Sequence, residues 1–139
     1  MYKIPSLFIL GLVAFTSCNK EASDTLSGLS PIQQKIAGKW RVHSVTHLQE
    51  NGPGRFQYRG SGFDYFDFSK DSIYTYVLGR NVNAGYNLLG DDSTMALVFP
   101  MPDGSKKKDT MFITSLTSNL LVLRGKVNPG EIGIDSLVR

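Results

Sequence analysis

The fold is decided by the stretch KWRVHSVTHL at residues 39–48, in which apolar and polar side chains alternate. Successive side chains of a β-strand point to opposite faces, so Trp40 and Val42 fall on one face and His43 and His47 on the other. A period of two over this length predicts a strand with one side toward a core and the other toward solvent. We therefore expect both histidines to face solvent.

The chain after this strand continues as short β-prone segments separated by turn residues. A short helix or 3₁₀ turn is expected before the first strand, at Pro31–Ala37, with Ser30 placed to cap it. The regular spacing predicts an all-β fold, an antiparallel meander that closes as a barrel or stacks as a sandwich. The expected later strands are Gly62–Phe68, Ile73–Leu78, Gly85–Leu89, Thr94–Phe99, Thr110–Leu116, Leu120–Lys126 and Ile132–Val138.

Two pairs of aromatic residues follow each other in this pattern. Phe66 and Phe68 share one face of their strand, and Tyr74 and Tyr76 share one face of the next. A short hairpin would place the two pairs opposite each other. We therefore expect a cavity whose walls carry Trp40, Phe66, Phe68, Tyr74, Tyr76 and Leu97.

The N-terminal segment has the pattern of a secretory signal peptide. A basic start at Lys3 is followed by the apolar run Ile4–Phe15, which is shorter than the roughly 20 residues that a bilayer-spanning helix needs. Small residues then lead to Cys18, the only cysteine of the chain. We expect residues 1–17 to be removed. An ordinary signal peptide followed by an incidental cysteine is the alternative.

The sequence Phe15-Thr16-Ser17-Cys18 resembles the lipobox of bacterial lipoproteins. This resemblance implies that the Cys18 sulfur receives a diacylglyceryl group and that the new amino terminus receives a third acyl chain such as palmitate. Several acyl chains hold a protein at a membrane durably, whereas one chain holds it only marginally. Residues 18–30 are mostly small and polar and are expected to form a flexible tether. Asn19 stands where the inner-membrane retention signal of such lipoproteins has aspartate, and Lys20-Glu21 resembles the charged surface-export signals of some Gram-negative lipoproteins. This resemblance implies the outer membrane, on its periplasmic face or at the cell surface.

The charge of the chain is nearly balanced. Its 15 basic and 12 acidic side chains give a net charge of +3 at pH 7. The one dense basic run, Lys106-Lys107-Lys108, is flanked by turn residues and is expected at a solvated hairpin tip. A nucleic-acid-binding domain would show a basic stripe instead, so we expect no nucleic-acid partner.

The segment Gly38-Lys39-Trp40 resembles the start of the first strand in the lipocalin superfamily. The wider pattern is similar to small lipocalin-like lipoproteins of Gram-negative bacteria. The resemblance implies an antiparallel up-and-down barrel of about eight strands over residues 31–139, with the tryptophan at a closed base and small apolar ligands at the open end. The other motifs that carry it are Phe66-x-Phe68, Tyr74-x-Tyr76, Ile113 through Leu116 and Leu121-x-Leu123.

The glycine-rich connection Asn51–Ser61 lies where lipocalins carry a lid over the open end. Its glycines allow mobility, Phe56 and Tyr58 offer apolar or stacking surface, and Arg55 and Arg59 offer charge. A surface loop without any ligand is the alternative. The resulting candidate ligand-binding set is Trp40, Phe56, Tyr58, Phe66, Phe68, Tyr74 and Tyr76.

Catalytic and metal-binding patterns are weak in this sequence. On a strand, the backbones of His43 and His47 lie about 13 Å apart, too far for easy joint ligation of a metal. Asp64 and Asp67 point to opposite faces, and Asp71 belongs to a turn. We expect no metal, no cofactor and no enzymatic activity.

The sequence thus favours a lipid-anchored envelope lipoprotein that binds a small apolar or amphipathic molecule. The alternative is a structural or accessory subunit that docks on an outer-membrane protein complex through its outer β surface or its lid. An inhibitor or immunity-type protein that acts through the mobile loop is a third possibility.

Overall fold

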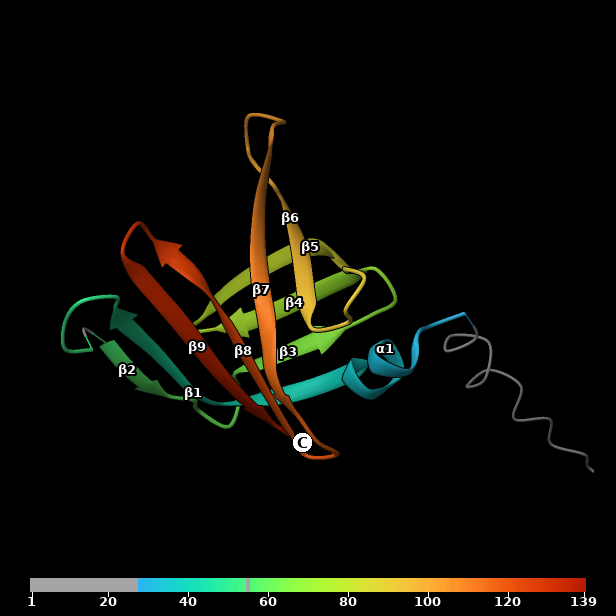
Figure 1. Cartoon of the computed structure of the whole chain (residues 1–139), viewed down its shortest axis with the longest axis horizontal. Coiled ribbons are helices and arrows are strands. Elements are labelled where there is room, and N and C mark those ends of the chain that lie inside the picture. Colours follow the sequence, from blue (N-terminus) through green and yellow to red (C-terminus); the bar gives the residue numbers. More distant parts are fainter. Residues whose placement is uncertain (1–27, 55) are drawn as a thin grey trace, which may run out of the picture.

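The computed structural model describes residues 28–54 and 56–139. The expected signal peptide, Cys18 and most of the expected tether lie outside these residues. The described chain forms one helix and nine strands (Figure 1). They are α1 (Pro31–Ile36), β1 (Gly38–Gln49), β2 (Phe56–Arg59), β3 (Tyr65–Phe68), β4 (Ser72–Val77), β5 (Arg80–Leu88), β6 (Thr94–Pro100), β7 (Lys106–Leu116), β8 (Leu120–Asn128) and β9 (Glu131–Val138).

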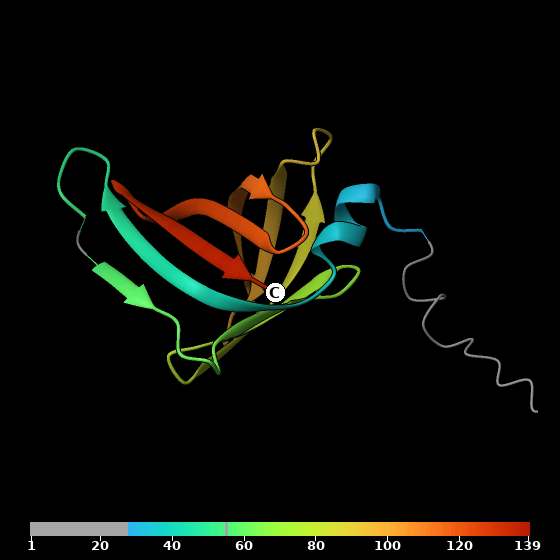
Figure 2. The ribbon, with the colours of Figure 1, turned by 90° about the horizontal axis from the view of Figure 1, so that it is seen from below.

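The strands close into an antiparallel barrel. Strand β1 pairs with β3, and each strand from β3 to β8 pairs with the next along the chain. Strand β9 then returns to pair with β1 from Arg41↔Val138 to Gln49↔Glu131. Strand β2 pairs only with β1 and lies outside this ring, so the ring has eight strands. The all-β prediction and the closed up-and-down barrel are confirmed. Figure 2 shows α1 beside one end of the barrel and the β1–β2 hairpin extending away from the barrel.

Strands β2 and β3 lie one after the other along the same edge of β1. Residues 56–59 pair with the second half of β1 and residues 65–68 with its first half. Between them the chain bulges, held by Gly60 N–H donating to His43 O at 3.1 Å and Val42 N–H donating to Asp64 O at 2.9 Å. The prediction of a loop over Asn51–Ser61 was therefore wrong for residues 56–59, which form a strand.

A β-bulge at His43 changes which side chains of β1 face the core. The register with β9 shifts between Val42 and Ser44. An extra residue reverses the alternation, so Trp40 and Val42 share the inner face with Val45 and His47 rather than with Ser44. Val45 accordingly packs against the core. His43 is exposed as expected, but the prediction that His47 faces solvent from the outer side was wrong.

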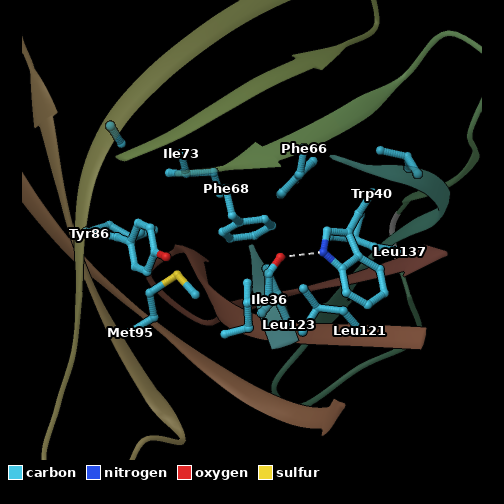
Figure 3. Packing of buried hydrophobic residues seen from close by; sticks show 13 residues of the cluster. Ile36, Trp40, Phe66, Phe68, Ile73, Tyr86, Met95, Leu121, Leu123 and Leu137 are labelled. Atoms are coloured by element: carbon cyan, nitrogen blue, oxygen red, sulfur yellow. Dashed lines mark hydrogen bonds between the residues drawn. The ribbon is translucent and has the colours of Figure 1, made fainter. Parts of the chain in front are cut away.

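Trp40 closes the base of the barrel. It is fully buried, and its Nε1–H donates to the Ile36 carbonyl of α1 at 2.6 Å (Figure 3). Arg139 lies over the indole ring, 4.2 Å from Cζ to the ring centroid, and donates to the carbonyls of Lys35 and Ala37. This is the base position that the family resemblance implies. Trp40 therefore lies at the base of the barrel, between α1 and Arg139.

The tyrosines of β4 lie on the outer face of the barrel. Phe66 pairs with Thr75 and Phe68 with Ile73, whereas Tyr74 and Tyr76 pair with Asp67 and Tyr65. Cross-strand partners point to the same side of a sheet. The prediction that the two aromatic pairs lie opposite each other was therefore wrong, because the register of β3 and β4 differs from the expected one by one residue. Outside, Tyr65 contacts both tyrosine rings at 6.0 Å.

Candidate functional site

A small apolar cavity lies inside the barrel. Its volume is about 220 Å³. Most of its wall comes from inward-facing apolar side chains of β3 to β7, which include Phe66, Ile73, Ala84, Leu97, Phe99 and Met111. Val82 also lines it and is 43% exposed, so the cavity reaches solvent on that side. The two polar groups in the wall are Thr75 and Asp135.

The size of the cavity limits what it can hold. An apolar cavity of about 150 Å³ in another protein binds benzene, so 220 Å³ has room for one ring with a short substituent. Pockets for drug-sized molecules are larger, about 300–1,000 Å³. The cavity therefore fits a molecule of about ten non-hydrogen atoms.

Asp135 is the one ionisable group in the cavity wall. It shares the inner face of β9 with Leu137 and lies between Val45 of β1 and Leu123 of β8. Burial raises the pKa of its carboxyl to about 6, and the nearby charge of His47 opposes that rise. Within the described chain, no residue donates a hydrogen bond to this carboxylate.

His47 lies beside Asp135 on the inner wall. Its Nδ1 is 3.4 Å from Glu131 Oε1, and its ring centroid is 5.4 Å from that of Phe56 on β2. A methyl group built on Gly133 of β9 would lie 3.8 Å from His47 Cδ2, which places the imidazole on the inner face. The Phe56 ring in turn stacks at 6.5 Å from that of Tyr58. The β1–β2 hairpin thus extends the inner wall with an imidazole and two aromatic rings.

Asp64 organises the bulge between β2 and β3. It is almost fully buried and accepts hydrogen bonds from Tyr58 Oη at 2.5 Å, from Ser61 N–H and Oγ at 2.7 Å, and from Leu78 N–H at 3.0 Å. Burial alone would raise the pKa of the carboxyl, but these donors outweigh it and lower the pKa to about 2. A carboxylate with all its acceptor sites used in this way has a structural role.

The residues predicted for the site divide into three groups. Phe66 lines the cavity, and Leu97 of the expected wall does too. Phe68 is buried in the core against Tyr86, with the two rings edge to face at 5.8 Å. Phe56 and Tyr58 lie on β2 beside His47, while Trp40, Tyr74 and Tyr76 are absent from the cavity wall.

Sequence reasoning missed Asp135 and His47. Asp135 lies on the same face of a predicted strand as Gly133 and Leu137. The available signal was therefore a single acidic residue that shares a strand face with a buried leucine. His47 carried no such signal because the bulge that turns it inward is a tertiary feature. Within residues 28–54 and 56–139, no group of three or more His, Cys, Asp or Glu side chains is placed to hold a metal ion.

A second hollow lies on the outer surface over β7, β8 and β9. Its volume is about 380 Å³, and Phe112, which is 49% exposed, lies in its wall with Ile132. Arg124 and Lys126 add two positive charges to this otherwise apolar groove.

Among the helices that the structure describes, none has the length and apolar character needed to cross a membrane.

Comparisons with known proteins give a likeness of fold only. No family model and no curated protein matches this chain. A lipocalin-like protein from Bacteroides uniformis is 18% identical, with a TM-score of 0.47 over 73% of this chain and 96% of that protein. An uncharacterized protein from Bacteroides eggerthii is 14% identical, with a TM-score of 0.45 over 72% of this chain and 97% of that protein.

Proposed function

We propose that this protein binds a small apolar or amphipathic molecule inside its barrel and has no catalytic role. The observation that carries the proposal is the 220 Å³ cavity with an apolar wall and two polar groups. Binding sites for small molecules combine a concave apolar wall with a few placed polar groups. The wall offers one carboxyl and one hydroxyl without a nucleophile–base pair, and this favours binding over catalysis.

Native mass spectrometry of the protein purified from its own host tests this proposal. We expect a reproducible adduct of a small molecule on the wild-type chain. Ala84→Leu extends a buried side chain of the wall into the cavity and should abolish the adduct. The matched control is Ala96→Leu on the neighbouring strand β6, since Ala96 alternates with the inward-facing Leu97 and lies on the outer face. An adduct that survives Ala84→Leu would contradict binding in the cavity.

We further propose that lipid on Cys18 holds the protein at the outer membrane. The support is the sequence pattern of residues 1–18, which lie outside the described residues. The mature protein should begin at Cys18 and carry the mass of a diacylglyceryl group and an acyl chain. Cys18→Ser should release the protein into the soluble envelope fraction. A mature protein of unmodified mass would contradict the anchor.

An accessory role in an outer-membrane protein complex is the second candidate function. The outer groove favours it, because an exposed apolar side chain flanked by cations is a typical feature of a docking surface. Crosslinking in the native host should then give a partner that is lost in Phe112→Ser and kept in Ala84→Leu. A partner that is insensitive to Phe112→Ser would exclude this groove as the docking surface.

A further inference from the structure

We propose that the barrel cavity selects small molecules that carry a protonated amine, with the ammonium group paired to the Asp135 carboxylate and the apolar body against Phe66, Leu97 and Met111. This inference rests on the proposed binding function and names its ligand class. It goes beyond that function because an apolar cavity alone would take neutral molecules equally well.

The Asp135 carboxylate lies in apolar surroundings. Asp135 is partly buried in an otherwise apolar wall, and no described residue donates a hydrogen bond to it. Placing an ionised carboxylate in such surroundings is unfavourable unless an opposite charge or a donor accompanies it. An ammonium group on the ligand supplies both the charge and up to three donors.

In the part of the chain that the structure describes, few other charged side chains lie on the inner face of the barrel near Asp135. On β7, Asp109 is the cross-strand partner of the inward-facing Leu97 and therefore lies on the inner face of the barrel. On β1, His47 is beside Asp135, and Glu131 of β9 lies against that histidine. The inner wall of β8 near Asp135 offers Leu123 and Gly125 and adds no charge. Of the described residues, Asp135 is therefore the one ionisable side chain that lines the cavity itself.

Two cations also share the inner phase of the barrel. Arg80 is opposite Val77 at the start of β5, and Lys107 is opposite Phe99 near the β6–β7 hairpin. Both side chains are exposed. Long exposed side chains in water attract a carboxylate weakly, so these two cations compete poorly with an ammonium group inside the cavity.

The polar groups of the wall suit an organic cation better than a metal ion. Metal ions such as Ca²⁺ take several oxygen ligands, whereas this wall presents one carboxylate and one hydroxyl. An organic amine needs only one carboxylate for its charge and uses the apolar wall for its remaining surface. Phe66 and Phe99 in the same wall are aromatic, and aromatic rings attract cations over their faces. The cavity size then selects amines with about one ring.

Three probes of one size and different charge test the inference: benzylamine, benzyl alcohol and benzoate. Their affinities for the intact protein are measured by NMR titration at pH 8, with the methyl signals of Ala84 and Met111 as reporters of the cavity. We expect benzylamine to bind at least tenfold more tightly than benzyl alcohol, and benzoate to bind most weakly. Asp135→Asn should remove the preference for the amine and leave the binding of benzyl alcohol nearly unchanged.

The matched control is Asp67→Asn, which removes a carboxylate from the outer face of β3 and should leave all three affinities unchanged. Lowering the pH to 5 should weaken benzylamine roughly tenfold as Asp135 becomes protonated. The weakening should be at least as large in His47→Gln, because the charge of His47 lowers the pKa of Asp135. If it disappears there, His47 is the group responsible and the assignment to Asp135 is wrong.

The outcomes separate this inference from the proposed function. If benzyl alcohol binds in the cavity as tightly as benzylamine, the cavity is a binding site but the amine selectivity is wrong. If the preference for the amine survives in Asp135→Asn, another group carries it and the inference is overturned. If no probe shifts the Ala84 or Met111 signals, both the inference and the binding function fail.

Discussion

Asp135 and Asp64 show how the same side chain takes opposite roles in two surroundings. The pKa of Asp135 is raised to about 6 because burial is met only by the opposing charge of His47. The pKa of Asp64 is lowered to about 2 because hydrogen bonds from Tyr58, Ser61 and Leu78 outweigh burial. A buried carboxylate that lacks hydrogen-bond donors in a cavity is typical of a functional group. A buried carboxylate that accepts several hydrogen bonds is typical of a structural group.

Replacing Asp135 by asparagine should stabilise the fold at neutral and alkaline pH. A carboxyl with a raised pKa in the folded state favours folding below its unfolded pKa of about 4, and this contribution is lost as the pH rises through about 6. Asp135→Asn should therefore raise the free energy of unfolding by about 2–3 kcal/mol at pH 8 and change it little at pH 4. Urea unfolding at both pH values measures this, with Asp67→Asn as the control. Equal effects at the two pH values would contradict the assignment.

Replacing Asp64 should have the opposite effect. A carboxyl with a lowered pKa stabilises the fold above its unfolded pKa, and this contribution is lost as the pH falls through about 2. The amide of Asp64→Asn has one acceptor oxygen for four donors, so we expect a loss of about 1–3 kcal/mol at pH 7. Urea unfolding should show the loss shrinking toward pH 2. A variant as stable as Asp67→Asn at pH 7 would refute the structural role.

At the scale of elements, period-two patterning predicted most of the barrel. It located the strand at residues 39–48 and the later strands because each has an inner face of apolar residues. It missed β2 because four residues in a glycine-rich segment carry too little pattern. It also placed Lys106-Lys107-Lys108 at a hairpin tip, whereas these exposed lysines begin β7.

Register was the main limit for the candidate site. The bulge at His43 and the one-residue offset between β3 and β4 each reverse the face of a side chain. Phe66 and Leu97 could be predicted because they belong to regular strands with apolar inner faces. His47, Tyr74 and Tyr76 could not, because pairing between strands decides their faces.

Gly60 should be required for the pairing of β2 with β1. A Cβ at this position would lie 1.9 Å from the Val42 carbonyl oxygen, so the backbone must move to accept it. Gly60→Ala should therefore detach β2 and speed hydrogen exchange at the amides of 56–59. Gly62→Ala is the control, since its Cβ would meet nothing within 4 Å. Unchanged exchange in Gly60→Ala would contradict the close approach.

The β4–β5 turn carries backbone strain at Leu78. Leu78 has a φ of 52° and is followed by Gly79 at 72°, the positive values of a type I′ hairpin turn. Asparagine tolerates this conformation better than leucine, so Leu78→Asn should raise the free energy of unfolding by about 1 kcal/mol. Leu89→Asn, at another exposed leucine, should give no such gain. Thermal unfolding of both variants measures the difference, and equal melting temperatures would contradict it.

At the scale of the whole molecule, the base and the cavity use different parts of one barrel. Helix α1, Trp40 and Arg139 seal one end, as the indole hydrogen bond and the stacked guanidinium show. The cavity wall comes from strands β3 to β7 and β9, which closure of β9 onto β1 brings together. This closure makes a concave apolar wall from segments that are far apart in the sequence.

Xenon binding in a pressurised crystal tests the central claim most directly, because xenon enters apolar cavities without needing polar partners. We expect a xenon peak inside the barrel, between Ala84, Leu97 and Met111, and its loss in Ala84→Leu. A barrel interior without xenon, with a peak only in the outer groove beside Phe112, would contradict the account and favour the accessory role.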